Sequence, residues 1–389
     1  MNSVKKLDAI IDDIKIGTLA VADNHLCAFE YSDEWLAKGY SISPFSLPLE
    51  KKVFIPKAYT PFEGIFGIFA DSLPDGWGRL LVDRLLMKNK INPYEVDAIN
   101  RLAIVGKSGM GALEYYPENR FMQEEEKMSL DEIAAECEKI FETNNSDSLD
   151  TIFQMGGSSG GARPKVYYEL DGSEWIVKFP SSYDSKDIGR QEYEYSLCAR
   201  KCGIDMPETR LLSSQKCAGY FAVKRFDRVE GKKVHMASVS GLLETSHRIP
   251  NLDYNQLMKL TFILTKSYEE IEKMYRLMCF NVFAHNRDDH SKNFSYIYNT
   301  EEKMWKLSPA YDLTYSNSIG GEHATMVDGN GYNPGMKEIL QVAGNIGMDN
   351  KRAETIADDI YEIVRCNLQE YIKQMHRLTV KTGITSSGS

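Results

Sequence analysis

The residues best suited to chemistry gather in the segment 285–293, which reads HNRDDHSKN. Its Arg-Asp pair, followed by an asparagine five residues after the first aspartate, matches the catalytic loop of protein kinases. In that loop the aspartate is the base and the asparagine binds a metal ion. We therefore predict that Asp288 accepts the proton of a substrate hydroxyl and that Asn293 binds Mg²⁺, with Asp289 as the weaker candidate for the base.

Two other interpretations of this segment stay open. His285, Asp288 and His290 are residue types that ligate metals, although no further cluster of histidines or cysteines completes such a site. A capped loop without chemistry is the other interpretation. The spacing of these residues alone does not exclude either the metal site or the capped loop in favour of the kinase loop.

A further acidic residue, Asp312, follows an expected strand at 304–307, within the stretch SPAYD. Kinase-like folds place at this point an aspartate that holds Mg²⁺ against the phosphates. A carboxylate and an amide oxygen suit Mg²⁺, which takes a few protein oxygens and completes its shell with phosphate and water. We predict that Asp312 and Asn293 are the Mg²⁺ ligands.

The stretch 156–161 contains four glycines and two serines, and we expect it to connect strands at 151–154 and 165–169. Without Cβ atoms, such a loop lets its main-chain N–H groups approach phosphate oxygens. It is not a Walker A loop, because it lacks the GK[ST] ending and runs on into a strand. A flexible hairpin tip is the alternative.

One hairpin beyond this loop, Lys178 lies in an apolar strand expected at 175–179. A lysine that faces inward there needs an anionic partner, and kinase-like folds use a lysine at this point to hold nucleotide phosphates. Its helical glutamate partner is predicted to be Glu192, with Glu194 as the second choice. An outward-facing lysine on a half-exposed strand is the competing interpretation.

The elements that must position these residues mix strands and helices. Ser129 and Glu132 form a capping-box pattern that begins a helix at 129–143, with apolar residues on one stripe. The chain turns mostly helical from residue 252, except for a hairpin at 294–307. Further strands are expected at 19–21, 27–31 and 221–226, and further helices after residue 79 and at 187–203.

Composition narrows the class of protein. The 389 residues are 42% hydrophobic and 26% charged, which is typical of a folded chain with two or three domains. The seven cysteines include no CxxC pair, so a disulfide framework or a structural zinc site is not expected. No stretch approaches the roughly 20 apolar residues of a membrane helix, and no signal peptide is evident, so we expect a cytoplasmic protein without membrane contact.

The net charge of −10 argues against strong direct binding to nucleic acid. Part of the acidity is local, because residues 121–150 contain ten acidic residues and two lysines. Outside that segment the chain is close to neutral, and no run of lysines or arginines announces a basic face.

Six motifs, in order along the chain, resemble those of the HipA family, the serine/threonine-kinase toxins of bacterial HipA–HipB toxin–antitoxin pairs. The resemblance covers nearly the whole chain. The motifs are SLPDGWGR at 72–79, GMGAL at 109–113, GSSGGARPK at 157–165, AVKRFDR at 222–228, DDHSKNF at 288–294 and SPAYD at 308–312.

The resemblance implies an α+β, two-lobed protein-kinase-like fold with an extra N-terminal subdomain and a mostly helical C-terminal lobe. It implies phosphorylation of protein serine or threonine with ATP and Mg²⁺. Known members act on aminoacyl-tRNA synthetases and on a serine of their own glycine-rich loop, which corresponds here to Ser158 first and Ser159 second. The implied partner is a HipB-like helix-turn-helix antitoxin, through which the acidic chain would mainly reach operator DNA.

The resemblance also implies a set of nucleotide-binding residues. Two departures from the family pattern concern them: Arg163 and Pro164 replace a common Gln-containing stretch, and Lys224 stands where a glutamate is common. The resemblance places Lys224 in the connector beside the adenine of ATP. Contacts from this connector to adenine would come from the main chain, so a lysine in place of glutamate need not prevent binding. The implied residues are Ser158, Ser159, Gly160, Gly161, Ala162, Arg163, Lys165, Lys178, Glu192, Lys224, Phe226, His290 and Lys292.

The expected organisation is a HipA-type N-terminal subdomain at 1–117, an acidic helical joint at 118–146, a kinase-like small lobe at 147–251 and a helical large lobe at 252–389. The leading function is an active protein kinase. A small-molecule phosphotransferase with the same fold, and a corepressor that works only through its antitoxin, are the alternatives. Measurement of ATP turnover separates the last from the other two.

Overall fold

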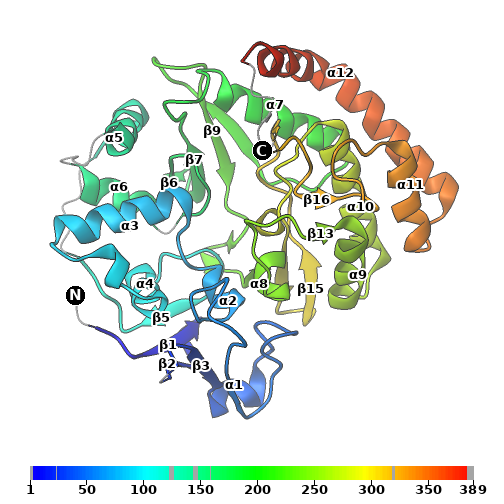
Figure 1. The fold of residues 1–389 in the computed structure, drawn as a ribbon. Helices are drawn as coiled ribbons and strands as arrows, with labels where there is room; N and C mark the ends of the chain where they lie inside the picture. The colour runs from blue at the N-terminus through cyan, green and yellow to red at the C-terminus, as the bar shows by residue number, and fades with distance from the viewer. Residues whose placement is uncertain are drawn as a thin grey trace, which may run out of the picture. The chain divides into compact units, whose positions relative to one another are not determined.

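The computed structural model describes residues 3–22, 24–121, 127–142, 148–157, 159–317 and 320–382. They form two compact units, drawn in Figure 1. The first consists of Met1–Gly189 and Arg210–Ser246, and the second of Arg190–Thr209 and His247–Ser389. Within the described ranges, no helix combines the length and apolarity needed to cross a membrane.

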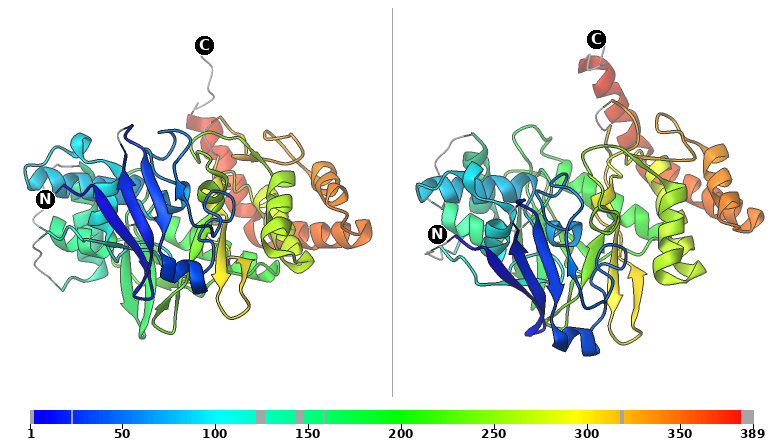
Figure 2. Two further views of the ribbon diagram at one scale, coloured as in Figure 1. Left: turned by 90° about the horizontal axis from the view of Figure 1, so that it is seen from below. Right: turned by 60° about the horizontal axis from the view of Figure 1, so that its bottom comes forward.

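The first unit begins with an antiparallel sheet in the order β4-β3-β2-β1-β5, whose blue strands run side by side in Figure 2. Leu7, Ala9 and Ile11 are buried along one strand and alternate with less buried residues. This period of two gives the sheet one apolar face. The strands are β1 (Lys6–Ile11), β2 (Ile14–Val21), β3 (Cys27–Tyr31), β4 (Val53–Phe54) and β5 (Glu114–Tyr116).

The helix predicted at 129–143 begins at a side-chain cap. The predicted capping box is present: the Ser129 hydroxyl accepts from the Glu132 N–H (3.3 Å), and the Glu132 carboxylate accepts from the Ser129 N–H (2.7 Å). The helices are α1 (Asp33–Lys38), α2 (Gly67–Ala70), α3 (Gly76–Lys88), η1 (Pro93–Glu95), α4 (Ala98–Val105), α5 (Leu130–Glu142), α6 (Leu149–Gly156) and α8 (Val239–Leu243).

A second sheet, in the order β6-β7-β9-β8, packs against α3, α5 and α6. Trp77 of α3, Ile133 of α5, Ile152 of α6 and Val177 of the sheet are fully buried in one shared core. The strands are β6 (Lys165–Leu170), β7 (Ser173–Lys178), β8 (Thr209–Leu212) and β9 (Tyr220–Lys224), with the short β10 (Arg228–Val229), β11 (Lys232–Lys233) and β12 (Met236–Ser238) beyond.

The predicted strand at 151–154 is wrong, because these residues lie in helix α6. The β-branched pair Thr151-Ile152 favours a strand locally. In the fold, however, Leu149, Ile152 and Gly156 recur at helical spacing and are buried. Packing of that face into the core outweighs the local preference.

In the second unit, the buried helix α10 packs against α9, α11 and α12. The carboxylate of Glu270, on α10, accepts a hydrogen bond from the N–H of Leu307 (2.7 Å) and pairs with Lys273 (2.6 Å), which ties the predicted hairpin to this helix. The elements are α7 (Ile188–Lys201), β13 (Leu252–Asp253), α9 (Tyr254–Thr265), α10 (Tyr268–Phe283), η2 (Ser291–Asn293), β14 (Ser295–Asn299), β15 (Met304–Leu307), β16 (Thr325–Met326), α11 (Met336–Asn345) and α12 (Asn350–Thr382).

Candidate active site

The segment 285–293 is the connection between α10 and β14. His285, just past the helix, has a left-handed backbone with φ of 54°, which turns the chain out of the helix direction. The buried Asn286 donates from its side chain to the side-chain oxygen of Asn281 (2.9 Å). The main-chain carbonyl of His285 accepts from the N–H of Ser316 (3.0 Å). These bonds fix the loop against its own helix and against the chain that follows Asp312.

The two adjacent aspartates have opposite environments. The Asp288 side chain is 62% exposed, whereas that of Asp289 is fully buried. An exposed carboxylate on a fixed loop can meet a substrate hydroxyl, and a buried one that is already hydrogen-bonded cannot. The geometry therefore favours Asp288 over Asp289 for the role of base.

Asp289 is the centre of a buried polar network. Its carboxylate accepts from the Tyr254 hydroxyl (2.9 Å) and the main-chain N–H of Thr325 (3.1 Å), and it lies 2.9 Å from Nδ1 of His323. Burial and the charge of Asp289 raise the pKa of Tyr254 well above its ordinary value, so the phenol stays protonated and donates. Every polar partner of this carboxylate is thus supplied from within the second unit.

A hydrogen bond links the segments that carry Asn293 and Asp312. The side-chain amide of Asn293 donates to the main-chain carbonyl of Asp288 (2.7 Å). The hydroxyl of Tyr311 donates to the main-chain carbonyl of Lys292 (2.7 Å). The residue before Asp312 therefore lies against the residue before Asn293.

The backbone of Asp312 is left-handed, with φ of 54°. This conformation is uncommon for a residue other than glycine, and such strain persists only where the surrounding structure holds it. Strained residues of this kind concentrate at functional sites. The role of Asp312 as a Mg²⁺ ligand stays a prediction.

His290 lies beside Asp288, with 3.9 Å between its Nε2 and the carboxylate. Its Nδ1 accepts from the N–H of Lys292 (3.2 Å) and thereby caps η2. The ring of His247 packs 5.5 Å from it, centroid to centroid. In the part of the chain that the structure describes, no group of three or more His, Cys, Asp or Glu side chains is placed to hold a metal ion, which disfavours the site from His285, Asp288 and His290.

The glycine-rich loop lies between helix α6 and strand β6, not between two strands. Ser158 lies outside the described residues. Ser159 is 2% exposed, and its hydroxyl donates to the carbonyl of Gly156 (2.6 Å). The ammonium of Lys165 lies so near Gly161 that an added Cβ there would meet its nitrogen at 2.6 Å. The positively charged side chain of Lys165 therefore points back over the glycine-rich loop.

The SLPDGWGR motif contacts this loop directly. The Asp75 carboxylate accepts from the main-chain N–H of Gly161, and the N–H of Trp77 donates to the Gly161 carbonyl (2.9 Å). The indole N–H of Trp77 donates to the carbonyl of Lys165 (3.1 Å). A Cβ on Gly78 would lie 2.1 Å from the carbonyl oxygen of Ser159, so this close approach requires glycine. The start of α3 thus holds both ends of the loop.

The other residues predicted from the resemblance are spread over both units. Arg163 is paired with Asp184 (3.2 Å), and the ammonium of Lys178, at the end of β7, lies 5.5 Å from the centroid of the Phe221 ring. Lys224 and Phe226 are half-buried at the end of β9 and just beyond it, in the first unit, while Glu192 is buried on α7 in the second. Gly160 and Ala162 belong to the loop, and Lys292 to η2.

Two further motifs bind each other in the first unit. The guanidinium groups of Arg225 and Arg228 both pair with the buried Asp227 (2.8 and 2.9 Å), which also accepts from the N–H of Gly111 (2.8 Å). Arg228 donates to the carbonyl of Gly109 (3.0 Å). Burial acts to raise the pKa of Asp227, but the two arginine charges outweigh it and hold that pKa below its usual range. The motifs GMGAL and AVKRFDR thus form a structural ion cluster.

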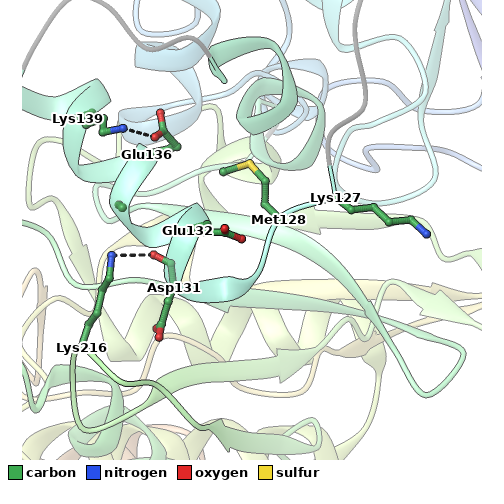
Figure 3. A pocket seen from close by; sticks show the side chains of 8 residues that line it. Lys127, Met128, Asp131, Glu132, Glu136, Lys139 and Lys216 are labelled. Atoms are coloured by element: carbon green, nitrogen blue, oxygen red, sulfur yellow. Dashed lines mark hydrogen bonds and ion pairs between the residues drawn. The ribbon is translucent and has the colours of Figure 1, made fainter.

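A pocket also lies along the surface of α5 (Figure 3). Its charged side chains are largely satisfied locally: the Lys216 ammonium donates to the carbonyl of Asp131 (3.0 Å), and Lys139 pairs with Glu136. None of the predicted site residues lines it. The lining residues are Lys127, Met128, Asp131, Glu132, Ala135, Glu136, Lys139 and Lys216.

Sequence reasoning missed two positioning features. The first is the set of hydrogen bonds from Asp75 and Trp77 to the glycine-rich loop, although the motif that contains them resembles one of the family. The second is the Asp289–His323 contact, which joins residues 34 positions apart. The resemblance of SLPDGWGR to a family motif is the one available signal for the first feature, and nothing in the sequence pairs residues 289 and 323.

Two domain-family models match this chain. A model described as the HipA-like C-terminal domain matches residues 157–367, and one described as the HipA N-terminal domain matches residues 7–116. A search of curated proteins found no match.

Among solved structures, the chain is similar to one from the Shewanella oneidensis MR-1 toxin–antitoxin complex of HipA, HipB and operator DNA. The identity is 17%, the match covers 94% of this chain and 90% of that chain, and the TM-score is 0.69. The Helicobacter pylori proinflammatory kinase CtkA is 12% identical over 57% of this chain and 95% of that chain, with a TM-score of 0.37.

The Shewanella match covers 94% of this chain, so the expected α+β fold of HipA type, with an N-terminal subdomain ahead of a kinase-like part, is confirmed. The C-terminal family model alone spans more than half of the sequence, and the N-terminal model matches most of what precedes it. The chain therefore belongs to the HipA family.

Proposed function

We propose that this protein is an ATP- and Mg²⁺-dependent serine/threonine-protein kinase and the toxin of a bacterial toxin–antitoxin pair. The observation that carries the proposal is the arrangement around Asp288. Its carboxylate is exposed on a loop that the buried Asp289 holds in place. Its main-chain carbonyl accepts a hydrogen bond from the side chain of Asn293. A base and a metal-binding amide held in this relation are the parts that phosphoryl transfer to a hydroxyl requires.

In this proposal Asp288 orients the substrate hydroxyl and takes its proton. Asn293 holds the loop through its amide nitrogen, which leaves its Oδ1 as the atom for a metal ligand. Lys165 and Lys178 supply positive charge toward phosphate, and Glu192 is the proposed partner of Lys178. The glycine-rich loop, held by Asp75 and Trp77, offers main-chain N–H groups to the nucleotide.

The donor set fits Mg²⁺. The amide oxygen of Asn293 and the carboxylate of Asp312 are hard oxygen ligands, and the Tyr311–Lys292 bond keeps their segments adjacent. When bound, Mg-ATP supplies the phosphoryl group, and the metal neutralises its charge.

The proposed partner is a HipB-like helix-turn-helix antitoxin. The similar Shewanella protein was solved with HipB and operator DNA. With a net charge of −10, this chain would reach DNA mainly through such a partner. The proposed substrate is a protein of translation, such as an aminoacyl-tRNA synthetase, which is what the family resemblance implies.

The test is transfer of labelled phosphate from ATP to protein by the purified chain and by Asp288→Asn. Asp358→Asn makes the same chemical change on the exposed face of α12 and serves as the control. We expect labelled protein with the wild type and the control, and about 10²- to 10⁴-fold slower labelling with Asp288→Asn. Phosphoproteomics after brief expression of wild type and Asp288→Asn would then identify the target.

Transfer only to small molecules would replace the proposal with a phosphotransferase. The chain would instead be a corepressor if it did not turn over ATP and if its addition made the antitoxin bind operator DNA more tightly. Equal labelling by Asp288→Asn would remove the assigned base.

A further inference from the structure

The two neighbours of Asp288 in the sequence both bind the same later segment, residues 320–332. Nη1 of Arg287 donates to the carbonyl of Gly321 (2.7 Å), and its Nη2 lies 3.4 Å from the carbonyl of Tyr332. The main-chain carbonyl of Arg287 accepts from the N–H of Ala324 (3.0 Å). One arginine thus joins both ends of this segment to the loop that carries the proposed base.

Asp289 fastens the middle of the same segment. Its carboxylate lies 2.9 Å from Nδ1 of His323 and accepts from the N–H of Thr325 (3.1 Å). Asp289, His323 and Thr325 are all at most 3% exposed. Because the bonds are shielded from water, they are worth more than equivalent bonds on a surface.

The segment is also held on its other side. Strand β16 pairs in parallel with β13, and the N–H of Gly329 donates to the carboxylate of Asp253 (2.7 Å). The N–H of His323 donates to the carbonyl of Gly331 (2.8 Å), which closes the segment on itself. Residues 320–332 are therefore anchored to the loop, to the start of α9 and to each other.

This arrangement differs from a common way of ordering a kinase. In many protein kinases the segment that follows the metal-binding aspartate is ordered by its own phosphorylation, because an arginine binds the new phosphate. Here the arginine that precedes the proposed base binds neutral main-chain carbonyls. These two contacts are made by Nη1 and Nη2 without a phosphate, while the buried Nε of Arg287 makes no hydrogen bond within the described residues.

We propose that Arg287 and Asp289 are positioning residues that latch residues 320–332 to the catalytic loop and so assemble the site without phosphorylation of that segment. The proposal rests on the function proposed for Asp288. The latch orders the loop through two independent connections, one to main-chain carbonyls and one to a buried side-chain network. In this proposal the loop that carries Asp288 is held in place in the unphosphorylated protein.

The first test compares Arg287→Lys and Arg287→Ala with the wild type. A lysine keeps the charge but cannot bridge the carbonyls of Gly321 and Tyr332. Arg365→Ala, which removes an exposed arginine of α12 paired with Glu362, is the matched control. We expect both Arg287 variants to lose hydrogen-exchange protection in residues 320–332 and to lower kcat by about 10- to 100-fold with little change in the KM for ATP, as displacement of a catalytic group predicts.

The second test concerns modification. Active wild-type protein is treated with phosphatase, mass spectrometry verifies that residues 320–332 carry no phosphate, and kcat is measured again. We expect full activity. Activity that appears only when this segment is phosphorylated would overturn the proposal, as would Arg287→Ala with unchanged protection and unchanged kcat.

The exchange measurement keeps this proposal separate from the proposed kinase activity. A wild-type chain without any turnover would refute the kinase, while loss of protection in Arg287→Lys would still establish the latch. Normal turnover with no change in protection or kcat in the variants would refute the latch alone. Asp289→Asn, which keeps the side-chain volume, provides a second variant should Arg287→Ala fail to fold.

Discussion

The side-chain amide of Asn293 donates a 2.7 Å hydrogen bond to the main-chain carbonyl oxygen of Asp288. The two residues are five positions apart in the sequence, and this bond closes the chain between them into a small loop. It fixes the backbone at Asp288 without using the carboxylate, which remains 62% exposed. It also assigns the two ends of the Asn293 amide, because the nitrogen is used and the oxygen is left for a ligand.

Asp288→Asn should lower phosphoryl transfer by about 10²- to 10⁴-fold, which is the usual worth of a general base. The side chain is exposed, so the thermal unfolding midpoint should not change. Asp289→Ala should instead unfold the second unit more easily, by roughly 3–5 kcal/mol, because it leaves buried polar partners unsatisfied. Kinase assays and thermal denaturation of both variants check the contrast. A loss of activity in Asp289→Ala with no loss of stability would reassign the base.

Lys178→Ala and Asp312→Ala should weaken nucleotide binding in different ways. Loss of Lys178 removes a charge-assisted contact to phosphate, worth roughly 10- to 100-fold in affinity with or without Mg²⁺. Loss of Asp312 should act only through the metal and raise the Mg²⁺ concentration required. Calorimetric titration of an ATP analogue at several Mg²⁺ concentrations measures both effects. The same metal dependence in the two variants would count against the assignment of Asp312.

Gly78→Ala should displace the glycine-rich loop. The new methyl would lie 2.1 Å from the carbonyl oxygen of Ser159 and 2.9 Å from Cβ of Pro74, so the backbone has to move. We expect a loss of stability of about 1–3 kcal/mol, typical of overpacking, together with weaker ATP binding. Gly344→Ala, in helix α11 with open space around it, is the control and should be neutral or slightly stabilising. Unchanged ATP affinity in a folded Gly78→Ala would show that the loop does not depend on this contact.

Incubation with Mg-ATP should phosphorylate Ser158 in preference to Ser159. The Ser159 hydroxyl is buried and donates to the carbonyl of Gly156, so it is not presented to a second molecule. A phosphate in this loop adds about −1.5 to −2 charges, which compete with the nucleotide for the same N–H groups. Activity should fall as the phosphate accumulates. Mass spectrometry locates the site; modification at neither serine in an active enzyme, or a phosphorylated loop that binds ATP with unchanged affinity, would refute the prediction.

Stability should fall as the pH is lowered from about 6.5 to about 4, in part through His235. Burial lowers the pKa of this histidine to about 4, although its Nε2 lies 2.9 Å from the carbonyl of Ile42. The unfolded chain binds the proton at higher pH than the folded one does, so acid favours unfolding by up to about 3 kcal/mol from this group. His235→Gln should unfold with a shallower pH dependence over that range. Equal slopes for the two proteins would show that His235 does not contribute.

The sequence alone determined the residue types of the candidate site and their order. The Asp-x4-Asn spacing, the later Asp312 and the glycine-rich stretch are local patterns, readable because each functional unit lies within a few consecutive residues. The helices at 129–143 and 187–203 and the hairpin at 294–307 were likewise predictable, since apolar periodicity and turn residues are local properties. The family was predicted from six motifs, and the domain models confirm that family.

Only the tertiary structure decided which of two adjacent aspartates is available. Asp288 and Asp289 are chemically identical neighbours, and their burial differs because the loop, turned at His285, directs one side chain to His323 and Thr325 and the other outward. The grip of Asp75 on Gly161 joins residues 86 positions apart, and no local pattern encodes such a pair. Helix α6 was missed for the same physical reason: its β-branched residues favour a strand, and burial against α3 and α5, which the sequence does not display, outweighs that preference.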